Sequence, residues 1–313
     1  MRAARLHEIS GPLHLDEVDR PVAGVGQVVV DMAYASVNPL DVWITQGNVG
    51  VAGANLPWTP GTEGTGYVDG RPVFVRGGGI GVMRQGLYAE QAVVPSDAVE
   101  PLADDRQLAE LAGLGVAGVT AWNAVHVQGH VVAGDRVVVL GASGGVGSLA
   151  VQLAKATGAT VWGQSGSPDK VAGIVAGGAD HAFVAAADGL ATSLADFAPT
   201  VVLDALGGPY TAGAIDALAV GGRLVVYGTS AGEVVTFNMR TMYRKGLTIS
   251  GYTGLVEPAD QARRVMAGLI EQLIAGSIRV PVELVPLADA ATAHRRIVDR
   301  QVTGKLVLDI RAH

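Results

Sequence analysis

The sequence predicts an α/β protein that combines a doubly wound parallel sheet with a second, mostly-β domain. Up to about residue 120, the 313-residue chain reads as short strands and turns. After about residue 130, continuous apolar runs alternate with segments of helical period, which is typical of a parallel sheet covered on both faces. A glycine-rich turn directly follows the first of these runs, and such turns open dinucleotide-binding sheets.

In the first part of the chain, short β-rich runs are separated by turn residues. Asp69-Gly70 lies between two such runs and predicts a two-residue hairpin, because both residues tolerate the positive φ of a type I′ turn. The expected strands are 27–32, 66–68, 72–75 and 90–94. These short strands predict a barrel-like domain.

In the second part, six apolar runs predict the strands of one parallel sheet, at 136–140, 160–163, 181–184, 200–204, 223–227 and 247–250. Beyond residue 255 we expect two further helices, 258–275 and 287–300, and two strands, 282–285 and 305–310, which rejoin the first domain. The predicted division is therefore 1–123 with 255–313 for the mostly-β domain and 124–254 for the dinucleotide-binding domain.

Composition excludes several classes of function. A formal net charge of −7 without a local Lys/Arg cluster argues against nucleic acid as a partner. No stretch approaches 18 apolar residues, and the N-terminus lacks the pattern of a signal peptide, so we expect a cytoplasmic protein without a membrane partner. The absence of cysteine excludes disulfides, a thiolate nucleophile and any cysteine-ligated metal.

The turn after Leu140 is a dinucleotide fingerprint in the right context, between a strand and a helix. Gly144 allows the backbone to approach a pyrophosphate, and Gly147 allows close helix–sheet packing. The usual first glycine is replaced by Ala142. The helix that follows presents backbone amides and partial positive charge to an anion. The predicted cofactor-binding residues of this turn are Ser143, Gly144, Gly145, Val146 and Gly147.

The end of the second strand indicates which dinucleotide is bound. Folds that select NAD usually carry an Asp or Glu there, which binds the ribose hydroxyl, whereas residues 163–167 contain no carboxylate. A 2′-phosphate would meet no repulsion, Ser165 could donate a hydrogen bond to it, and Lys170 could supply charge. The prediction is NADPH. A purely structural role stays open, in which Ser167 caps the next helix and Lys170 is solvated.

Several short motifs recur in an order that spans nearly the whole chain. They are Asn38-Pro39-Leu40-Asp41, Pro60-Gly61-Thr62-Glu63-Gly64-Thr65-Gly66, Gly86-Leu87-Tyr88-Ala89-Glu90, Thr120-Ala121-Trp122, Gly134-Asp135-Arg136-Val137, Ala293-His294 and Gly304-Lys305-Leu306-Val307-Leu308. In this order the chain resembles the zinc-independent quinone oxidoreductases of the medium-chain dehydrogenase/reductase superfamily.

This resemblance implies a GroES-like catalytic domain and hydride transfer from NADPH to a quinone or an α,β-unsaturated carbonyl compound. It places Asn38 and Thr120 near the nicotinamide, together with Tyr227, Gly228, Thr229 and Ser230 after the fifth strand. We take Asn38, Thr62, Tyr88 and Tyr252 as catalytic candidates, with water as the alternative proton donor. Trp43 and Trp58 are candidates for the wall of a substrate pocket, although a core role fits Trp43 equally. Asp41 is expected to cap a turn rather than to handle protons, and a homodimer is expected from the family.

No metal is expected in the site. In the zinc alcohol dehydrogenases of the superfamily, the catalytic ligands would fall near Asn38 and at Thr62, and neither residue type is a plausible zinc ligand. His126 and His130 have the spacing of a ligand pair, but they lack the accompanying Glu and precede a loop. We interpret them as ordinary surface histidines.

Two other functions stay open. An enoyl-thioester reductase or a polyketide-tailoring reductase would need basic residues for its large acyl carrier, for which Arg71, Arg76 and Arg84 are the candidates. From a different class, the chain could bind NADPH without catalysis. Turnover of a panel of quinones, enones and thioesters distinguishes these three functions.

Overall fold

The computed structural model describes residues 1–50 and 55–312, and it divides the chain into two compact units. Unit 1 comprises residues 1–116 and 279–313, and unit 2 comprises residues 117–278. These divisions differ from the predicted ones because one helix near residue 120 and one near residue 265 are grouped with unit 2. The predicted division, 1–123 with 255–313 and 124–254, therefore stays a prediction about which residues form the catalytic domain and which form the dinucleotide-binding domain.

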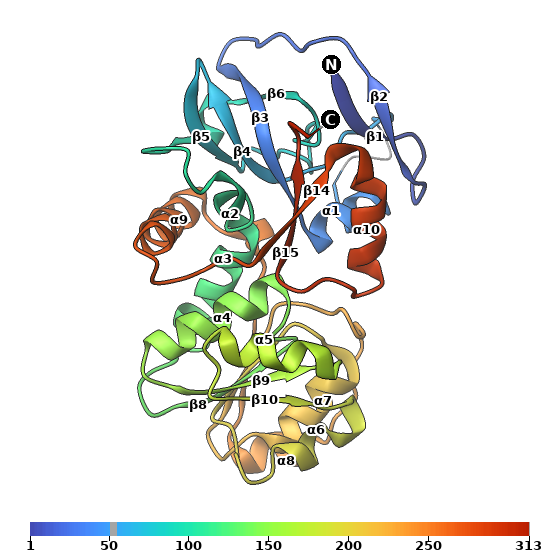
Figure 1. Ribbon diagram of the computed structural model, residues 1–313. Coiled ribbons are helices and arrows are strands. Elements are labelled where there is room, and N and C mark those ends of the chain that lie inside the picture. The colour runs from blue at the N-terminus through green and yellow to red at the C-terminus, as the bar shows by residue number, and fades with distance from the viewer. Residues whose placement is uncertain (51–54, 313) are drawn as a thin grey trace. The chain divides into compact units, whose positions relative to one another are not determined.

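Unit 1 is built around a seven-stranded sheet of mainly antiparallel strands, drawn in blue, cyan and red in Figure 1. Its strands run in the order β14-β15-β3-β4-β5-β7, with β6 also pairing with β3. Their bounds are β3 Gln27–Val37, β4 Glu63–Val68, β5 Arg71–Arg76, β6 Gln91–Pro95, β7 Val99–Pro101, β14 Val282–Pro286 and β15 Lys305–Asp309. A separate two-stranded sheet is formed by β1 Arg2–Leu6 and β2 Leu13–Glu17. The helices of this unit are α1 Pro39–Thr45, α2 Leu108–Ala112 and α10 Ala290–Val298.

The two ends of the chain share this sheet. β15 pairs antiparallel with β3, in a register that places Leu306 opposite Val37. The C-terminal strand therefore completes the sheet that the N-terminal residues begin, as expected from the sequence. The predicted hairpin is also confirmed, because Asp69 and Gly70 join β4 to β5 with positive φ angles of 49° and 75°.

Unit 2 contains a parallel sheet in the order β10-β9-β8-β11-β12-β13. The chain moves outward from the central β8 in one direction and then returns to continue in the other, which is the doubly wound arrangement. The bounds are β8 Arg136–Leu140, β9 Thr160–Ser165, β10 His181–Val184, β11 Val201–Asp204, β12 Arg223–Val226 and β13 Thr248–Gly251. All six strands occur where the apolar runs predict them, so the fold class is confirmed for this unit.

Helices cover both faces of the parallel sheet, with α4 and α5 on one face and α6 and α7 on the other (Figure 1). The helices are α3 Gly115–Trp122, α4 Gly145–Ala156, α5 Val171–Ala176, α6 Leu190–Ser193, α7 Gly208–Ala217, α8 Met239–Lys245 and α9 Ala259–Ile274, and a π-helix spans Asn123–Gln128. No helix in residues 1–50 and 55–312 is long and apolar enough to cross a membrane. Since parallel strands end at a common edge, the loops after β8, β9, β11, β12 and β13 gather there.

Candidate functional site

The turn after β8 has the geometry that a bound pyrophosphate requires. Its positive φ, 71°, lies at Gly141, so Ala142 does not need glycine's conformational freedom. A Cβ at Gly147 would lie 2.3 Å from the carbonyl oxygen of Gly141, and only glycine permits this approach of α4 to the strand. A Cβ at Gly144 would contact only the same oxygen, at 3.5 Å, so the backbone there stays open to a ligand.

Gln164 braces this turn from the neighbouring strand. Its side-chain oxygen accepts the N–H of Gly141 at 3.1 Å, and its backbone oxygen accepts the N–H of Ala142 at 3.0 Å. The side-chain amide also donates to the carbonyl of Ala185 at 2.8 Å, and Gln164 is only 1% exposed. The first amides of the turn are thereby occupied, which leaves the N-terminus of α4 as the part that can bind an anion. No sequence motif predicts this role of Gln164.

The predicted phosphate-discriminating residues lie at the end of β9. Ser165 is 1% exposed, and its hydroxyl donates to the carbonyl of Ser167 at 3.0 Å. Ser167 stands at the N-cap position of the short 3-10 helix Pro168–Lys170, with Pro168 in its first turn, but its side chain makes no capping hydrogen bond and contacts Asp169 Oδ1 instead. Lys170 ends this helix and is half-buried. No carboxylate lies between residues 163 and 167.

The remaining predicted cofactor residues in unit 2 follow strands that end at the same edge. Residues 227–230 follow β12, where the N–H of Tyr227 donates to the carbonyl of Asp204 and the hydroxyl of Ser230 donates to the carbonyl of Ala205. The phenol oxygen of Tyr227 is buried without a hydrogen-bond partner. Thr120 lies on α3 and is half-buried.

Tyr252 follows β13 and belongs to a polar cluster of unit 2. Its phenol donates to Glu257 Oε2 at 2.8 Å, and Asn123 Nδ2 donates to Glu257 Oε1 at 2.9 Å. Asn123 is 1% exposed and begins the π-helix, a feature frequent at functional sites. Tyr252 thus has a carboxylate with which it can exchange a proton.

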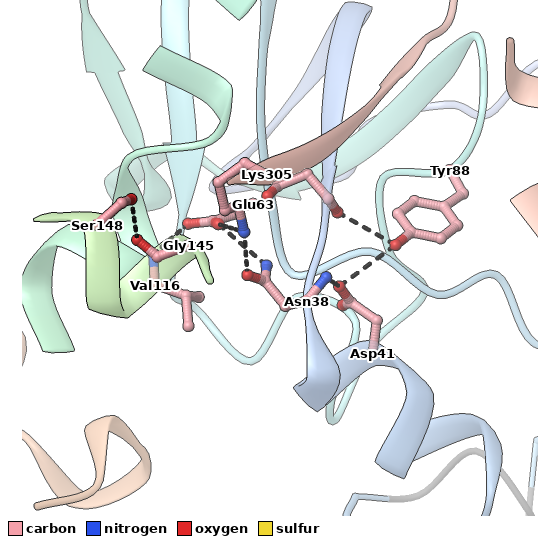
Figure 2. Close-up of polar contacts among 9 residues, drawn as sticks. Asn38, Asp41, Glu63, Tyr88, Val116, Gly145, Ser148 and Lys305 are labelled. Atoms are coloured by element: carbon pink, nitrogen blue, oxygen red, sulfur yellow. Dashed lines mark hydrogen bonds and ion pairs between the residues drawn. The ribbon is translucent and has the colours of Figure 1, made fainter. Parts of the chain in front are cut away.

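A second polar cluster, in unit 1, surrounds Asn38 at the start of α1 (Figure 2). Asn38 Nδ2 donates to Glu63 Oε1 at 3.0 Å, and Lys305 Nζ donates to Asn38 Oδ1. Lys305 Nζ also lies 3.9 Å from Glu63 Oε1, and Glu63 Oε2 accepts the backbone N–H of Val116. Glu63 is fully buried and Lys305 is 4% exposed, so burial lowers the pKa of Lys305 while Glu63 opposes that change.

These bonds fix the direction of the Asn38 side chain. An amide oxygen only accepts and an amide nitrogen only donates. The amide nitrogen of Asn38 therefore faces the carboxylate of Glu63, and its oxygen faces the ammonium group of Lys305. One of the two N–H groups of Asn38 is committed to Glu63, and the amide has a second to offer. Asn38 is thus held as a donor.

Asp41, three residues along α1, caps that helix. Its Oδ2 accepts the backbone N–H of Asn38 at 2.7 Å, so the predicted capping role is confirmed. Complete burial raises the pKa of Asp41 from 3.8 to about 6, an effect that the N–H of Asn38 opposes and the charge of Glu63 reinforces. The carboxyl group is therefore able to hold a proton close to neutral pH.

Tyr88 and Thr62, two of the catalytic candidates, both lie beside Asp41. The fully buried Tyr88 phenol donates to the carbonyl of Ser36 at 3.1 Å and contacts Asp41 Oδ2 at 3.3 Å (Figure 2). Burial, with the Asp41 charge, raises the pKa of Tyr88 well above its usual value. The hydroxyl of Thr62 helps to lower the pKa of Asp41, but neither Thr62 Oγ1 nor Asp41 Oδ1 has a well-formed hydrogen bond. Their capacity is unused.

The two predicted pocket residues differ in their surroundings. Trp43 lies on α1 and is 39% exposed, so its indole can contact a ligand. Trp58 is 2% exposed, belongs to the main core of unit 1 and donates its indole N–H to the carbonyl of Gly81 at 3.2 Å. In unit 2, the ring of His126 packs against Trp122 at 4.2 Å, so His126 is half-buried rather than a surface residue, whereas His130 is exposed.

No group of three or more His, Asp or Glu side chains that could hold a metal ion occurs among the described residues. Sequence analysis quoted Glu63 and Lys305 as parts of motifs but gave them no role. The signal that could have found them is a charged residue within an otherwise apolar strand, most clearly Lys305 before Leu306-Val307-Leu308.

Known proteins match both units. Residues 24–104 match the alcohol dehydrogenase GroES-like domain, and residues 145–271 match the zinc-binding dehydrogenase family. A quinone oxidoreductase from Rattus norvegicus is 30% identical, over 98% of this chain and 97% of its own length. A mycocerosic acid synthase-like polyketide synthase from Mycolicibacterium smegmatis is 28% identical over 95% of this chain, which spans only 15% of that synthase.

Solved structures give the same picture. An NAD-dependent alcohol dehydrogenase is similar with a TM-score of 0.88 and 28% identity, over 99% of this chain and 100% of that one. The quinone oxidoreductase from Thermus thermophilus, whose complex with NADPH is known, has a TM-score of 0.82 and 28% identity over the same shares of both chains. The chain therefore belongs to the quinone oxidoreductase family of the medium-chain dehydrogenases/reductases and is a nicotinamide-dependent oxidoreductase.

Proposed function

We propose that this chain is an NADPH-dependent reductase of quinones or α,β-unsaturated carbonyl compounds that works without a metal ion. The observation that carries the choice of NADPH is the end of β9, where Gln164 and Ser165 stand in place of a carboxylate. A carboxylate there would repel a 2′-phosphate, and residues 163–167 contain none. Lys170 adds positive charge nearby.

The residues of unit 2 fit a dinucleotide. The N-terminus of α4 and the open backbone at Gly144 would hold the pyrophosphate, and residues 227–230 with Thr120 would hold the nicotinamide side. When bound, the nicotinamide supplies a hydride to the substrate.

Residues of unit 1 polarise the substrate carbonyl and donate a proton to the reduced substrate. Asn38, held by Glu63 and Lys305, donates its second N–H to the oxygen of the substrate carbonyl, where negative charge develops during reduction. Thr62 donates a proton to the reduced substrate, and Asp41 replaces it, because a carboxyl group with a pKa of about 6 carries protons near neutral pH. Tyr252, paired with Glu257, is the alternative donor. By the resemblance to the zinc alcohol dehydrogenases, the catalytic metal ligands would fall near Asn38 and at Thr62, and neither residue type is a plausible zinc ligand.

The test is oxidation of NADPH and NADH against 1,4-quinones, enones and enoyl thioesters, with wild type, Ser165→Asp and the control Ser193→Asp, an exposed serine of α6. We expect kcat/KM for NADPH to exceed that for NADH at least tenfold in wild type and in the control, and the ratio to fall at least tenfold in Ser165→Asp. A preference for NADH in wild type would refute the cofactor assignment. Binding without turnover on any compound would refute the enzyme.

A second candidate, an enoyl-thioester reductase, is favoured by the similarity to a polyketide synthase segment. Arg71 and Arg76 lie at the two ends of β5, and Arg84 donates to the carbonyl of Gly78 at 3.0 Å. A kcat/KM for thioesters above that for quinones would select this candidate. We also propose a cytoplasmic homodimer in which β13, the edge strand of the parallel sheet, pairs with its copy. A monomeric mass in solution would refute the dimer.

A further inference from the structure

The parallel sheet of unit 2 has a topological switch point between β8 and β11. The chain runs from β8 outward through β9 to β10 and then returns to β11, on the other side of β8. Doubly wound sheets bind their ligands beyond the carboxyl ends of the strands at such a point. Leu140 ends β8 and lies opposite Asp204, which ends β11. Asp204 is therefore the last strand residue at the edge where the predicted cofactor residues gather.

The side chain of Asp204 is fully buried and organises the loop that follows it. Its Oδ1 accepts the N–H groups of Leu206 at 2.7 Å and of Gly207 at 3.0 Å. Its Oδ2 accepts the hydroxyl of Thr211, on α7, at 2.6 Å. Because both carboxyl oxygens are used locally, this group fixes the path of the chain from β11 into α7.

The loop 204–208 is in turn bonded to the segment that follows β12. Hydrogen bonds run from residues 227–231 to backbone carbonyls of residues 204–206. They include those from the Tyr227 N–H to Asp204 at 2.9 Å, from the Ser230 hydroxyl to Ala205 at 3.2 Å and from the Ala231 N–H to Leu206 at 2.6 Å. Residues 227–230 therefore take their position from the loop that the Asp204 carboxyl group holds.

The turn that would bind the pyrophosphate is held separately. Gln164 bonds Gly141 and Ala142 from β9, whereas Asp204 lies on β11, the other neighbour of β8. A change at Asp204 should thus displace residues 227–230 and leave the turn at 141–147 in place.

We propose that Asp204 is a positioning residue for hydride transfer, because it holds residues 227–230 where they bind the nicotinamide half of the cofactor. This inference rests on the proposed placement of the nicotinamide, but not on the choice between NADPH and NADH. Hydride transfer depends steeply on the alignment of donor and acceptor, and a displacement of about 1 Å can slow a reaction about a hundredfold. Loss of the bonds to Asp204 should therefore lower kcat while the adenosine half still binds.

The experiment is steady-state kinetics of the full-length chain, as wild type and as matched variants. Asp204→Leu removes every bond of the carboxyl group, and Thr211→Val removes only one and perturbs the fold less. Asp204→Asn is the rescue, because its oxygen can accept both N–H groups and its amide can donate to the Thr211 hydroxyl. The control is Thr200→Val, since the Thr200 hydroxyl donates to Asp135 at 2.7 Å at the opposite edge of the same sheet.

NADPH and NADH are each measured as hydride donor, with the quinone, enone or thioester that wild type reduces fastest. The fragments 2′-phospho-ADP-ribose and ADP-ribose, which carry no nicotinamide, are measured as competitive inhibitors. We expect kcat to fall about tenfold or more in Asp204→Leu and about threefold or more in Thr211→Val. The inhibition constants of the fragments should stay within about twofold of wild type, and Asp204→Asn and Thr200→Val should keep kcat within about twofold.

An unchanged kcat in Asp204→Leu, or in Thr211→Val if only that variant folds, would overturn the positioning role. Fragment binding that weakens as much as kcat falls would also overturn it, because the change would then be a general loss of structure. So would a kcat in Asp204→Asn as low as in Asp204→Leu, since the charge rather than the hydrogen bonds would then be required. Absence of turnover by wild type would refute the proposed enzyme, and the positioning role with it, whereas turnover that the Asp204 variants leave unchanged refutes the positioning role alone.

Discussion

Two buried groups of unit 1 should give its stability opposite dependences on pH. Asp41 has its pKa raised from 3.8 to about 6, so the folded state binds this proton more tightly than the unfolded state does. The contribution of Asp41 to the unfolding free energy is full below about pH 4 and is lost as the pH rises to about 6. His294 has its pKa lowered from 6.5 to about 4, so the folded state binds this proton less tightly than the unfolded state does. Its contribution to the unfolding free energy is therefore lost as the pH falls from about 6.5 to about 4.

The two effects are similar in size. Each difference between the folded and unfolded pKa corresponds to about 3 kcal/mol of unfolding free energy at most. In wild type they nearly cancel between about pH 4 and pH 6. Asp41→Asn keeps an oxygen that accepts the N–H of Asn38 and mimics the protonated acid. It therefore removes only the contribution to the unfolding free energy that falls as the pH rises. His294→Phe keeps the ring packing against Tyr88 and removes the contribution to the unfolding free energy that rises with pH.

The assay is urea unfolding of wild type and both variants at several pH values between 4.5 and 7. Hydrogen exchange of the Trp58 indole N–H reports unit 1 alone, since that donor is buried in its core. Relative to wild type, the unfolding free energy should rise with pH in Asp41→Asn and fall with pH in His294→Phe. Parallel curves for the three proteins would refute the assignment of both groups.

Three further outcomes follow from the geometry. Lys305→Met leaves the buried Glu63 without its countercharge and should lower the unfolding free energy, measured in urea, by about 3–5 kcal/mol. Adding Glu63→Gln to this variant should restore part of the loss. If the losses of the two single variants simply add, the pairing is contradicted. Gly147→Ala forces a Cβ to within 2.3 Å of a backbone oxygen and should weaken NADPH binding at least tenfold in a fluorescence titration, whereas Gly268→Ala, at an open helical position, should not. Asn38→Ala should reduce kcat about a hundredfold or more in steady-state kinetics, and a loss below tenfold would exclude it as the donor to the substrate oxygen.

The parallel sheet could be predicted from the sequence because its information is local. The strands β8, β11 and β12 carry continuous apolar runs, and the turn at Gly141–Gly147 identifies the first of them. The helices between residues 108 and 128 were harder to predict, since Gly113, Gly115 and Gly118 interrupt the helical pattern there. Burial against the rest of the chain, rather than local propensity, determines those helices.

The Asn38 cluster illustrates what a single sequence does not reveal. Glu63 and Lys305 are far apart in the chain, and they meet because β4 and β15 both pair with β3. The motif Asn38-Pro39-Leu40-Asp41 predicts the cap of α1, but the two bonds that orient the Asn38 amide come from those distant strands. The resemblance to the quinone oxidoreductases therefore pointed to Asn38, and only the topology identified the partners that fix the direction of its side chain.

The charge balance of this cluster is consistent with the raised pKa of Asp41. Two buried carboxyl groups, Asp41 and Glu63, share one ammonium group, that of Lys305. Glu63 lies 3.9 Å from the ammonium nitrogen and accepts hydrogen bonds from Asn38 and Val116. The cluster becomes neutral when Asp41 takes a proton, and burial favours that state. With its pKa raised to about 6, Asp41 is therefore partly protonated near neutral pH, and it lies beside the buried hydroxyl of Thr62.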